Sequence, residues 1–283
     1  MAGSAYFVLE GADGDGLGAS IGTAGNFDAG ASGIQEFLIG TNNTNELGLV
    51  IYTGASSSVN GIPADGAGLT QISFTTSAGE ATGDSVLGGY DFNNDGFVDV
   101  AISASKANAG AGAVYVIYGS TTSLNADLSA SDLLNPFINI NGDLGIVING
   151  LPGPDGFGAS LGATARFGEA DVLYISAPSF GSSSDANQGA VLEVDLTGVT
   201  SVSLSPTHYT YFGANGGDGF GTSIAADADL DGDGIGDLAI GAPGVDGSGS
   251  DNGQVVITLS STGATIRLDS EESTSLSGTF VSS

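Results

Sequence analysis

The sequence predicts an all-β repeat protein of about four four-stranded antiparallel units, the architecture of β-propeller blades. Short apolar segments alternate with turns rich in Gly, Asn, Asp and Ser, and a Gly-containing phrase recurs four times. No long segment keeps a helical period; only residues 124–134, just before Asn135-Pro136, predict one or two helical turns. A linear β-solenoid is the rival architecture, but its repeats are usually much shorter.

The recurring phrase marks the start of each unit. Each copy follows a turn rich in Gly and Asp, as at 11–16 and 216–219. The four copies are Leu17–Gly22, Leu87–Asp91, Phe157–Gly162 and Phe220–Ala225. Their first residues lie 70, 70 and 63 positions apart, which leaves room for four short strands in each unit.

Each phrase is followed by two apolar strands separated by a polar hairpin, and a further strand closes the unit. The first strands are predicted at 37–40, 98–103, 172–178 and 238–243, and the second at 48–52, 113–118, 190–194 and 254–259. Closing strands are predicted at 137–140, 209–212 and 265–268. We therefore expect one repeat domain over 1–283, with repeats at about 11–78, 79–148, 149–211 and 212–268 and a C-terminal tail or closing strand at 269–283.

A nine-residue acidic loop precedes the apolar strand of the fourth unit. It places side-chain oxygens at positions 1, 3, 5 and 9 and a backbone carbonyl at position 7. The predicted ligands are Asp229, Asp231, Asp233, the carbonyl of Ile235 and Asp237. Hard oxygen ligands at this spacing suit Ca²⁺, which takes about 6–8 oxygens, and Gly234 allows the sharp turn around the ion.

The second unit carries a second copy of this loop. Its predicted ligands are Asp91, Asn93, Asp95, the carbonyl of Phe97 and Asp99. Asp, Asn and Gly also form ordinary turns, but such turns would not repeat both the spacing and the strand that follows. Neither loop is an EF-hand, because position 12 is Ile102 or Ile240 instead of a bidentate Glu, and strands follow instead of helices. We therefore expect two Ca²⁺ sites.

The combination of Phe220-Gly221, the loop Asp229–Asp237 and Gly241-Ala242-Pro243 resembles the FG-GAP repeat of integrin α-subunit propellers and of related bacterial and archaeal extracellular proteins. The resemblance covers about residues 11–260 and is most specific in the fourth unit. It implies a Ca²⁺-stabilised propeller, extracellular or at the cell surface, that serves adhesion or ligand recognition.

Two units depart from the pattern of this family. In the first, Gly30 and Ser32 stand where ligands are expected beside Asp28 and Glu36. In the third, the segment 166–171 is too short for a nine-residue loop and begins with an arginine, so we expect no ion there.

The number of repeats leaves the closure of the fold open. Propellers of this family commonly have seven blades, whereas this chain shows four repeats. Four blades can form the smallest ring, with Tyr6–Leu9 pairing beside Thr265–Leu268. Alternatively, terminal strands such as 6–9 or 275–281 pair with a neighbouring copy and give a homo-oligomer or filament.

The charge balance excludes several classes of partner. Three Lys and Arg residues stand against 32 Asp and Glu residues, which gives a net charge of −29. The chain thus lacks the basic footprint that nucleic acids require.

It has no cysteine and no apolar run of about 18 residues that could span a membrane. The first ten residues do not form a signal peptide, so we expect a removed signal, another export route or a piece of a larger protein.

The repeat explains the apparent catalytic motifs. The phrase residues 18–22 and 158–162 fit the Gly-x-Ser-x-Gly nucleophile elbow, but no helix follows either copy. His208 is the only histidine, so it cannot serve as the base at two sites, and we expect it on the exposed face of a strand. We therefore name no catalytic residue and no residue that binds an organic cofactor.

We expect a non-enzymatic, secreted, calcium-binding β-repeat protein that serves adhesion or extracellular structure. Its expected partners are an extracellular protein or glycan ligand, or copies of itself. The alternative is an extracellular propeller hydrolase or lyase that acts on polysaccharide or lipid. Candidates for a sugar-binding surface are Tyr52, Tyr115, Tyr118, Tyr209 and Tyr211, although such aromatics more often pack between blades or pair across strands.

Overall fold

The computed structural model describes residues 10–11, 13–14, 16–27, 36–41, 47–53, 70–77, 79–119, 128–129, 144–181, 186–199, 202, 204–246 and 252–269. These residues are mostly in strands, with the short helix α1 (Ala107–Gly110) and the 3₁₀ turn η2 (Pro206–His208) among them.

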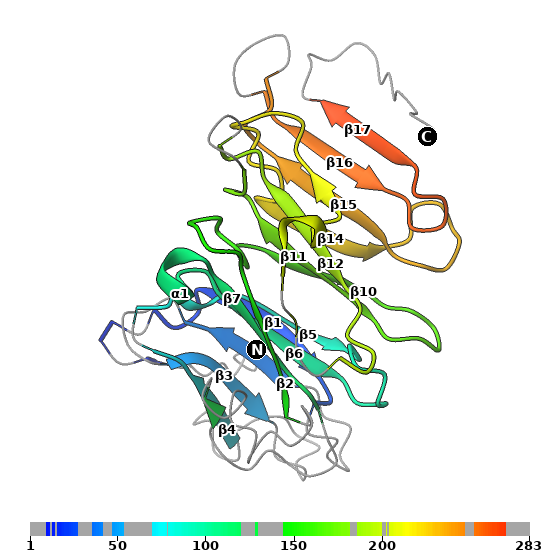
Figure 1. The fold of residues 1–283 in the computed structure, drawn as a ribbon. Helices are drawn as coiled ribbons and strands as arrows, with labels where there is room; N and C mark the ends of the chain where they lie inside the picture. The colour runs from blue at the N-terminus through cyan, green and yellow to red at the C-terminus, as the bar shows by residue number, and fades with distance from the viewer. Residues whose placement is uncertain are drawn as a thin grey trace, which may run out of the picture.

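The strands form four sheets, which we call blades 1 to 4 (Figure 1). Blade 1 contains β1 (Ser20–Gly25), β2 (Glu36–Gly40), β3 (Leu47–Thr53), β4 (Thr70–Thr75) and β8 (Leu128–Ser129). Blade 2 contains β5 (Thr82–Tyr90), β6 (Asp99–Ala104), β7 (Ala113–Ile117) and β9 (Gly145–Asn149). Blade 3 contains β10 (Leu161–Thr164), β11 (Val172–Ala177), β12 (Ala190–Val194) and β13 (Tyr211–Phe212). Blade 4 contains β14 (Ser223–Ala228), β15 (Asp237–Ala242), β16 (Gln254–Thr258) and β17 (Thr265–Asp269).

Neighbouring strands of each blade are antiparallel, which confirms the predicted all-β class of four-stranded units. The exception is β8, which pairs in parallel with β4 and gives blade 1 a fifth strand. Residues 128–129 were expected in a helical turn, and the rest of 124–134 lies outside the described residues. At 128–129 the prediction is wrong, because pairing with Phe74 and Thr75 outweighs a weak local helical preference.

The blades follow one another along an arc and pack face to face (Figure 1). Their first strands β1, β5, β10 and β14 lie side by side in this order. Buried apolar clusters fill each junction; Leu38 of blade 1 shares one with Ile102 of blade 2. No comparable contact joins β14 to β1, so the described strands form an open arc.

The recurring phrase forms the first strand of every blade, and its serine lies against a small residue of the second strand. The pairs are Ser20–Gly40, Ser85–Ser103, Ser160–Ser176 and Ser223–Gly241. In blade 2 the phrase therefore begins at Thr82 and not at the predicted Leu87. Thr82 replaces the apolar first residue of the other copies, which hides this copy from a search for the phrase.

Two of these serines also join neighbouring blades. The Ser20 hydroxyl donates to the carbonyl of Gly83 in blade 2 at 2.7 Å. The Ser160 hydroxyl accepts the N–H of Ile224 in blade 4 at 3.1 Å. The serines of both Gly-x-Ser-x-Gly matches thus take part in contacts between blades.

Candidate metal centre

The acidic loop of blade 4 connects β14 to β15 and folds around the side chain of its first residue. The carboxylate of Asp229 accepts N–H groups from Gly232 at 2.6 Å, Asp233 at 3.1 Å and Gly234 at 3.0 Å. Gly234 has a φ of 89°, which glycine adopts without steric cost. The spacing of Asp and Gly therefore produces a tight backbone turn around one carboxylate.

The last acid of this loop connects it to the turn between the two outer strands of the blade. Asp237 is 2% exposed and is the first residue of β15. One of its oxygens accepts the N–H of Leu230 at 2.8 Å. The other accepts the N–H of Ser260 at 2.9 Å, from the turn between β16 and β17. Both ends of the loop are thus held by one buried carboxylate.

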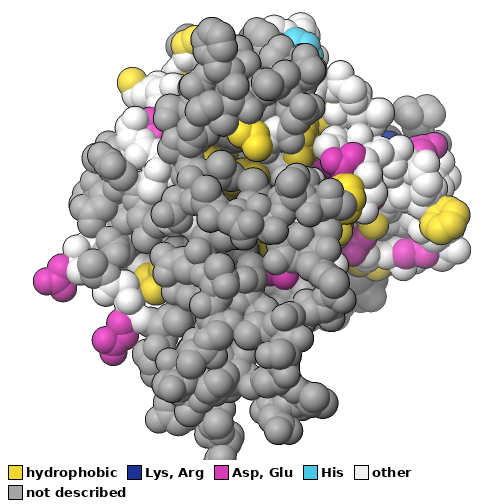
Figure 2. Space-filling view, turned by 90° about the horizontal axis from the view of Figure 1, so that it is seen from below, with side chains coloured by type: hydrophobic (Ala, Val, Ile, Leu, Met, Phe, Trp, Pro, Cys, Tyr) yellow, Lys and Arg dark blue, Asp and Glu magenta, His cyan; other side chains and the backbone are white. Residues whose placement is uncertain are grey.

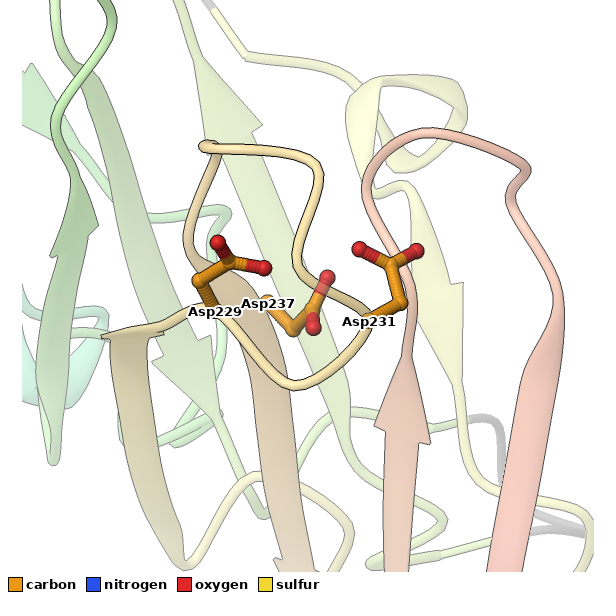
Figure 3. Close-up of side chains that lie close together, drawn as sticks. All are labelled: Asp229, Asp231 and Asp237. Atoms are coloured by element: carbon orange, nitrogen blue, oxygen red, sulfur yellow. The ribbon is translucent and has the colours of Figure 1, made fainter.

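Three of the predicted ligands lie close together. Asp229, Asp231 and Asp237 each place a carboxylate oxygen within 4.8 Å of the other two (Figure 3). Asp231 lies beside the β16–β17 turn, where Ser261 donates its hydroxyl to it at 2.7 Å. Converging carboxylates repel one another unless a cation lies between them. This all-oxygen donor set fits a hard divalent cation such as Ca²⁺.

The remaining predicted ligands of this loop lie outside the three-carboxylate cluster. Asp233 accepts the N–H of Ile235 at 2.7 Å, which leaves its other oxygen for a cation. The roles of Asp233 and of the Ile235 carbonyl as ligands remain predictions.

The loop of blade 2 repeats the hydrogen-bond pattern of blade 4. The carboxylate of Asp91 accepts the N–H groups of Asp95 at 3.0 Å and Gly96 at 2.8 Å. Asp95 in turn accepts the N–H of Phe97 at 2.9 Å. The same residue types at the same spacing therefore give the same backbone path in two blades.

The side chains of the blade 2 loop are less convergent. The Asn93 amide donates to Asp95 at 2.9 Å and so partly occupies its carboxylate. Within the described chain, the blade 4 cluster has no counterpart among the acids of this loop. The ligand set Asp91, Asn93, Asp95, Phe97 and Asp99 thus shares one loop and remains a prediction as a metal site.

Asp99 ends the blade 2 loop in the same way that Asp237 ends the blade 4 loop. Its side chain is fully buried and accepts N–H groups from Phe92 at 2.8 Å and Gly119 at 2.9 Å. The pKa of Asp99 is raised to about 8, mainly by burial; the two hydrogen bonds act against this rise, and the charges of Asp95 and Asp91 add to it. A cation in the loop would favour the ionised form of this carboxyl group.

Blades 1 and 3 keep the closing acid but not the full ligand set in their sequences. Glu36 is 2% exposed and accepts the N–H of Phe27 at 2.7 Å. In blade 3, Asp171 accepts the N–H of Arg166 at 2.7 Å, and the Arg166 guanidinium lies 3.7 Å from a carboxylate oxygen of Glu193. Asp28, Gly30 and Ser32 of the first unit lie outside the described residues.

Most of the other candidate residues cap a turn, pack between blades or make hydrogen bonds within a blade. His208 is exposed as expected, but it ends the 3₁₀ turn η2 and not a strand, because its ring accepts the N–H of Ser205 at 2.8 Å. Tyr115, Tyr118 and Tyr209 are at most 5% exposed and lie in clusters between blades. Tyr211 donates to Glu193 at 2.9 Å. The side chain of Tyr52 lies outside the described residues.

Sequence reasoning missed the partners that lie far along the chain. Ser260 and Ser261 belong to a hairpin more than twenty residues after the acids that they contact. Their hydroxyl groups in a turn carried no signal of this role, because serine is common in any turn.

These blades and loops define an all-β repeat protein with propeller-type blades. A model of the FG-GAP repeat matches residues 82–117 and 220–258, which cover the first three strands of blade 2 and of blade 4. The chain thus carries FG-GAP repeats at these two positions, and the resemblance seen in the sequence is confirmed there. Among curated proteins, no sequence matches the chain significantly. No helix of the described residues is long and apolar enough to cross a membrane.

Proposed function

We propose that this chain is a non-enzymatic, extracellular, calcium-binding protein whose blades serve adhesion or extracellular structure. The observation that carries the proposal is the cluster of Asp229, Asp231 and Asp237 inside an FG-GAP repeat. FG-GAP repeats are typical of propeller-type proteins that often act outside the cell. The same loop recurs in blade 2, so the proposal includes two Ca²⁺ ions.

The charge of the chain supports a role for bound cations. A net charge of −29 opposes compaction, because like charges repel. Figure 2 shows acidic side chains at several separate places on one face and little Lys or Arg among the described residues. Ca²⁺ held by the two loops would offset part of this repulsion. It would also hold each loop against the strand that follows.

The test is a calcium titration of the whole chain by isothermal titration calorimetry at low salt. We expect two sites, and the double variant Asp229→Asn/Asp231→Asn should lose one of them. The control Asp195→Asn removes an exposed carboxylate in the turn after β12 and should titrate like the unchanged chain. A double variant that binds as many ions as the unchanged chain would contradict the proposal.

The alternative function, a hydrolase or lyase, predicts turnover. The chain incubated with polysaccharides or lipids in calcium should then release reducing sugars, unsaturated sugars or fatty acids. The proposed function predicts none above the level of buffer, together with calcium-dependent retention on a protein or glycan surface.

A further inference from the structure

The junctions between successive blades share one arrangement. The glycine of each phrase packs against the small second-strand residue of the preceding blade. The pairs are Gly83 with Gly40, Gly158 with Ser103 and Gly221 with Ser176. A Cβ atom added at Gly40 would lie 2.2 Å from the Gly83 carbonyl oxygen, which leaves no room for a side chain. Each blade thus presents a groove, and the next blade fills it.

A second glycine shapes this groove at the start of the third strand. Gly112 and Gly189 have φ values of 79° and 84° and lie against the phenylalanines that begin the phrases of the next blades. An added Cβ would lie 2.3 Å from the carbonyl oxygen of Phe157 and 2.1 Å from that of Phe220, respectively. The backbone of the incoming phrase therefore lies directly on these glycines.

Blade 4 has the same groove without an occupant from the described chain. Gly253 has a φ of 75° and precedes β16, as Gly189 precedes β12. A Cβ added at Gly253 would approach only residues of its own blade, and so would one at Gly241. The two glycines line a groove of about 440 Å³ together with Val255 and Leu268.

Blade 1 carries the matching edge without a groove to receive it. Gly18 has a φ of 89°, close to the 86° of Gly158 and the 91° of Gly221. A Cβ added at Gly18 would meet no described atom within 4 Å. The edge Leu17–Gly18 thus has the backbone conformation of the buried phrases, but no described residue of another blade packs on Gly18.

The exposed apolar side chains of blades 1 and 4 occupy positions that are buried at the inner junctions. Ile21 of the first phrase is 70% exposed, whereas its counterparts Val86 and Leu161 are 9% and 7% exposed and Ile224 is partly buried. Val255 is 38% exposed, whereas its counterparts Val114 and Val191 are fully buried.

The second strand of blade 1 shows the same difference. Phe37 is 54% exposed, whereas its counterparts Val100, Leu173 and Leu238 are at most 2% exposed. The two end faces therefore have the composition of a blade junction, and no described residue of the chain packs on them as a neighbouring blade does.

We infer that the groove of blade 4 binds the Leu17–Gly18 edge of blade 1 of a second copy of this chain. The open arc keeps the two faces of one copy apart, because β14 and β1 make no comparable contact. The contact is head to tail, so two copies close an eight-blade ring or further copies continue the array. This inference goes beyond the proposed function, because it depends on neither calcium nor an adhesion partner.

The test is the mass of the whole chain in solution, measured by sedimentation velocity over a wide range of protein concentrations at moderate salt. We expect a dimer or a larger array. Ile21→Asp damages the blade 1 edge and Val255→Asp damages the blade 4 groove. Each alone should weaken association by at least about 100-fold, because an unpaired carboxylate becomes buried. The control Phe167→Asp replaces a fully exposed aromatic outside both faces and should associate like the unchanged chain.

Mixing the two variants distinguishes head-to-tail contact from other modes. An equimolar mixture of Ile21→Asp and Val255→Asp should form a dimer, because one intact groove meets one intact edge. An unchanged chain that stays monomeric at the highest concentration would overturn the inference. Full association of Ile21→Asp would overturn it as well, since the groove would then bind something other than this edge.

A covalent readout keeps the inference testable where a charged variant unfolds. Phe220 donates its N–H to the carbonyl of Gln188 at 3.2 Å, and the residues at the equivalent positions of blades 1 and 4 are Leu17 and Asn252. The chain has no cysteine, so Leu17→Cys and Asn252→Cys introduce the sole thiols. A mixture of the two should give a disulfide-linked dimer under mild oxidation. No linked dimer above the level of each variant alone would overturn the inference.

Discussion

The carboxylate of Asp171 in blade 3 accepts the backbone N–H of Asp91, the first residue of the blade 2 acidic loop, at 2.8 Å. The backbone N–H of Asp171 also donates to the carbonyl of Asp91 at 2.9 Å. The short loop of blade 3 lacks the metal-ligand pattern. It thus bonds both the N–H and the carbonyl group of the residue that begins the acidic loop of blade 2.

Replacing Asp171 by Ala should therefore affect two blades. The N–H groups of Arg166 and Asp91 would lose their acceptor, which lowers the free energy of unfolding by about 2 kcal/mol. We expect weaker calcium binding at the blade 2 loop as well. Urea denaturation measures the first effect and calorimetry the second. Asp195→Ala should leave calcium binding unchanged and should lower the free energy of unfolding much less, because the Thr197 N–H that Asp195 accepts is exposed to water. Equal effects of the two variants would contradict this role.

Chelation of calcium should lower the melting temperature at low salt. With a Kd of about 10⁻⁴–10⁻³ M, each site would stabilise the fold by about 1.4–2.7 kcal/mol at about 10 mM calcium. Differential scanning calorimetry with and without EGTA gives the shift. Unchanged melting after chelation would show that the loops do not hold calcium.

The third position of each loop offers a matched exchange of charge. The blade 4 loop has Asp231 there, whereas the blade 2 loop has Asn93. Asp231→Asn should weaken calcium binding at blade 4 by about tenfold, and Asn93→Asp should strengthen it at blade 2, because the number of charged ligands helps to set affinity. Titration of both variants checks the order. We expect calcium affinity to fall in Asp231→Asn and to rise in Asn93→Asp. A change in the same direction in both variants would argue against direct ligation.

The blade junctions predict that Ala substitutions at two glycines of similar conformation differ strongly in how much they lower the free energy of unfolding. Gly189→Ala places a Cβ 2.1 Å from the Phe220 carbonyl oxygen and should cost more than about 3 kcal/mol. Gly217 has a φ of 91° and open space around it, so Gly217→Ala should cost only about 1–2 kcal/mol of backbone strain. Chemical denaturation compares them. Similar costs would mean that blades 3 and 4 separate easily.

Strand positions followed from apolar segments between turn residues. The predicted strand 190–194 coincides with β12, and 172–178 exceeds β11 by one residue. The closing strands were harder to locate, because their neighbours in space set them. Blade 2 closes with β9 (Gly145–Asn149), which pairs with β7, whereas the sequence favoured 137–140, outside the described residues. The start of 209–212 is not a strand either, because β13 begins at Tyr211.

The acidic loops could be found from spacing alone, because their hydrogen bonds are local. Asp229 contacts residues three to five positions ahead, which the order of Asp and Gly specifies. Long-range contacts could not be found in this way. Neither the Asp171–Asp91 bridge nor the Ser261–Asp231 bond has a local pattern. The first depends on how blades 2 and 3 stack, and the second on how the β16–β17 turn lies against the acidic loop within blade 4. The groove of blade 4 could not be predicted from the sequence either, because it is recognised only by comparison with the filled grooves of the other blades.

In an isolated copy the open arc has two ends that differ from its middle. Among the described strands, blades 2 and 3 each pack against two neighbouring blades, whereas blades 1 and 4 pack against one. In arrays of this kind stability is a sum of each repeat's own stability and its contacts with adjacent repeats, so unfolding begins at the ends. The Asp229 loop lies in an end blade and the Asp91 loop in an inner one. An ion at the Asp229 loop would therefore oppose local unfolding of the C-terminal blade. An ion at the Asp91 loop would instead stabilise the inner blades, which unfold together with the whole chain.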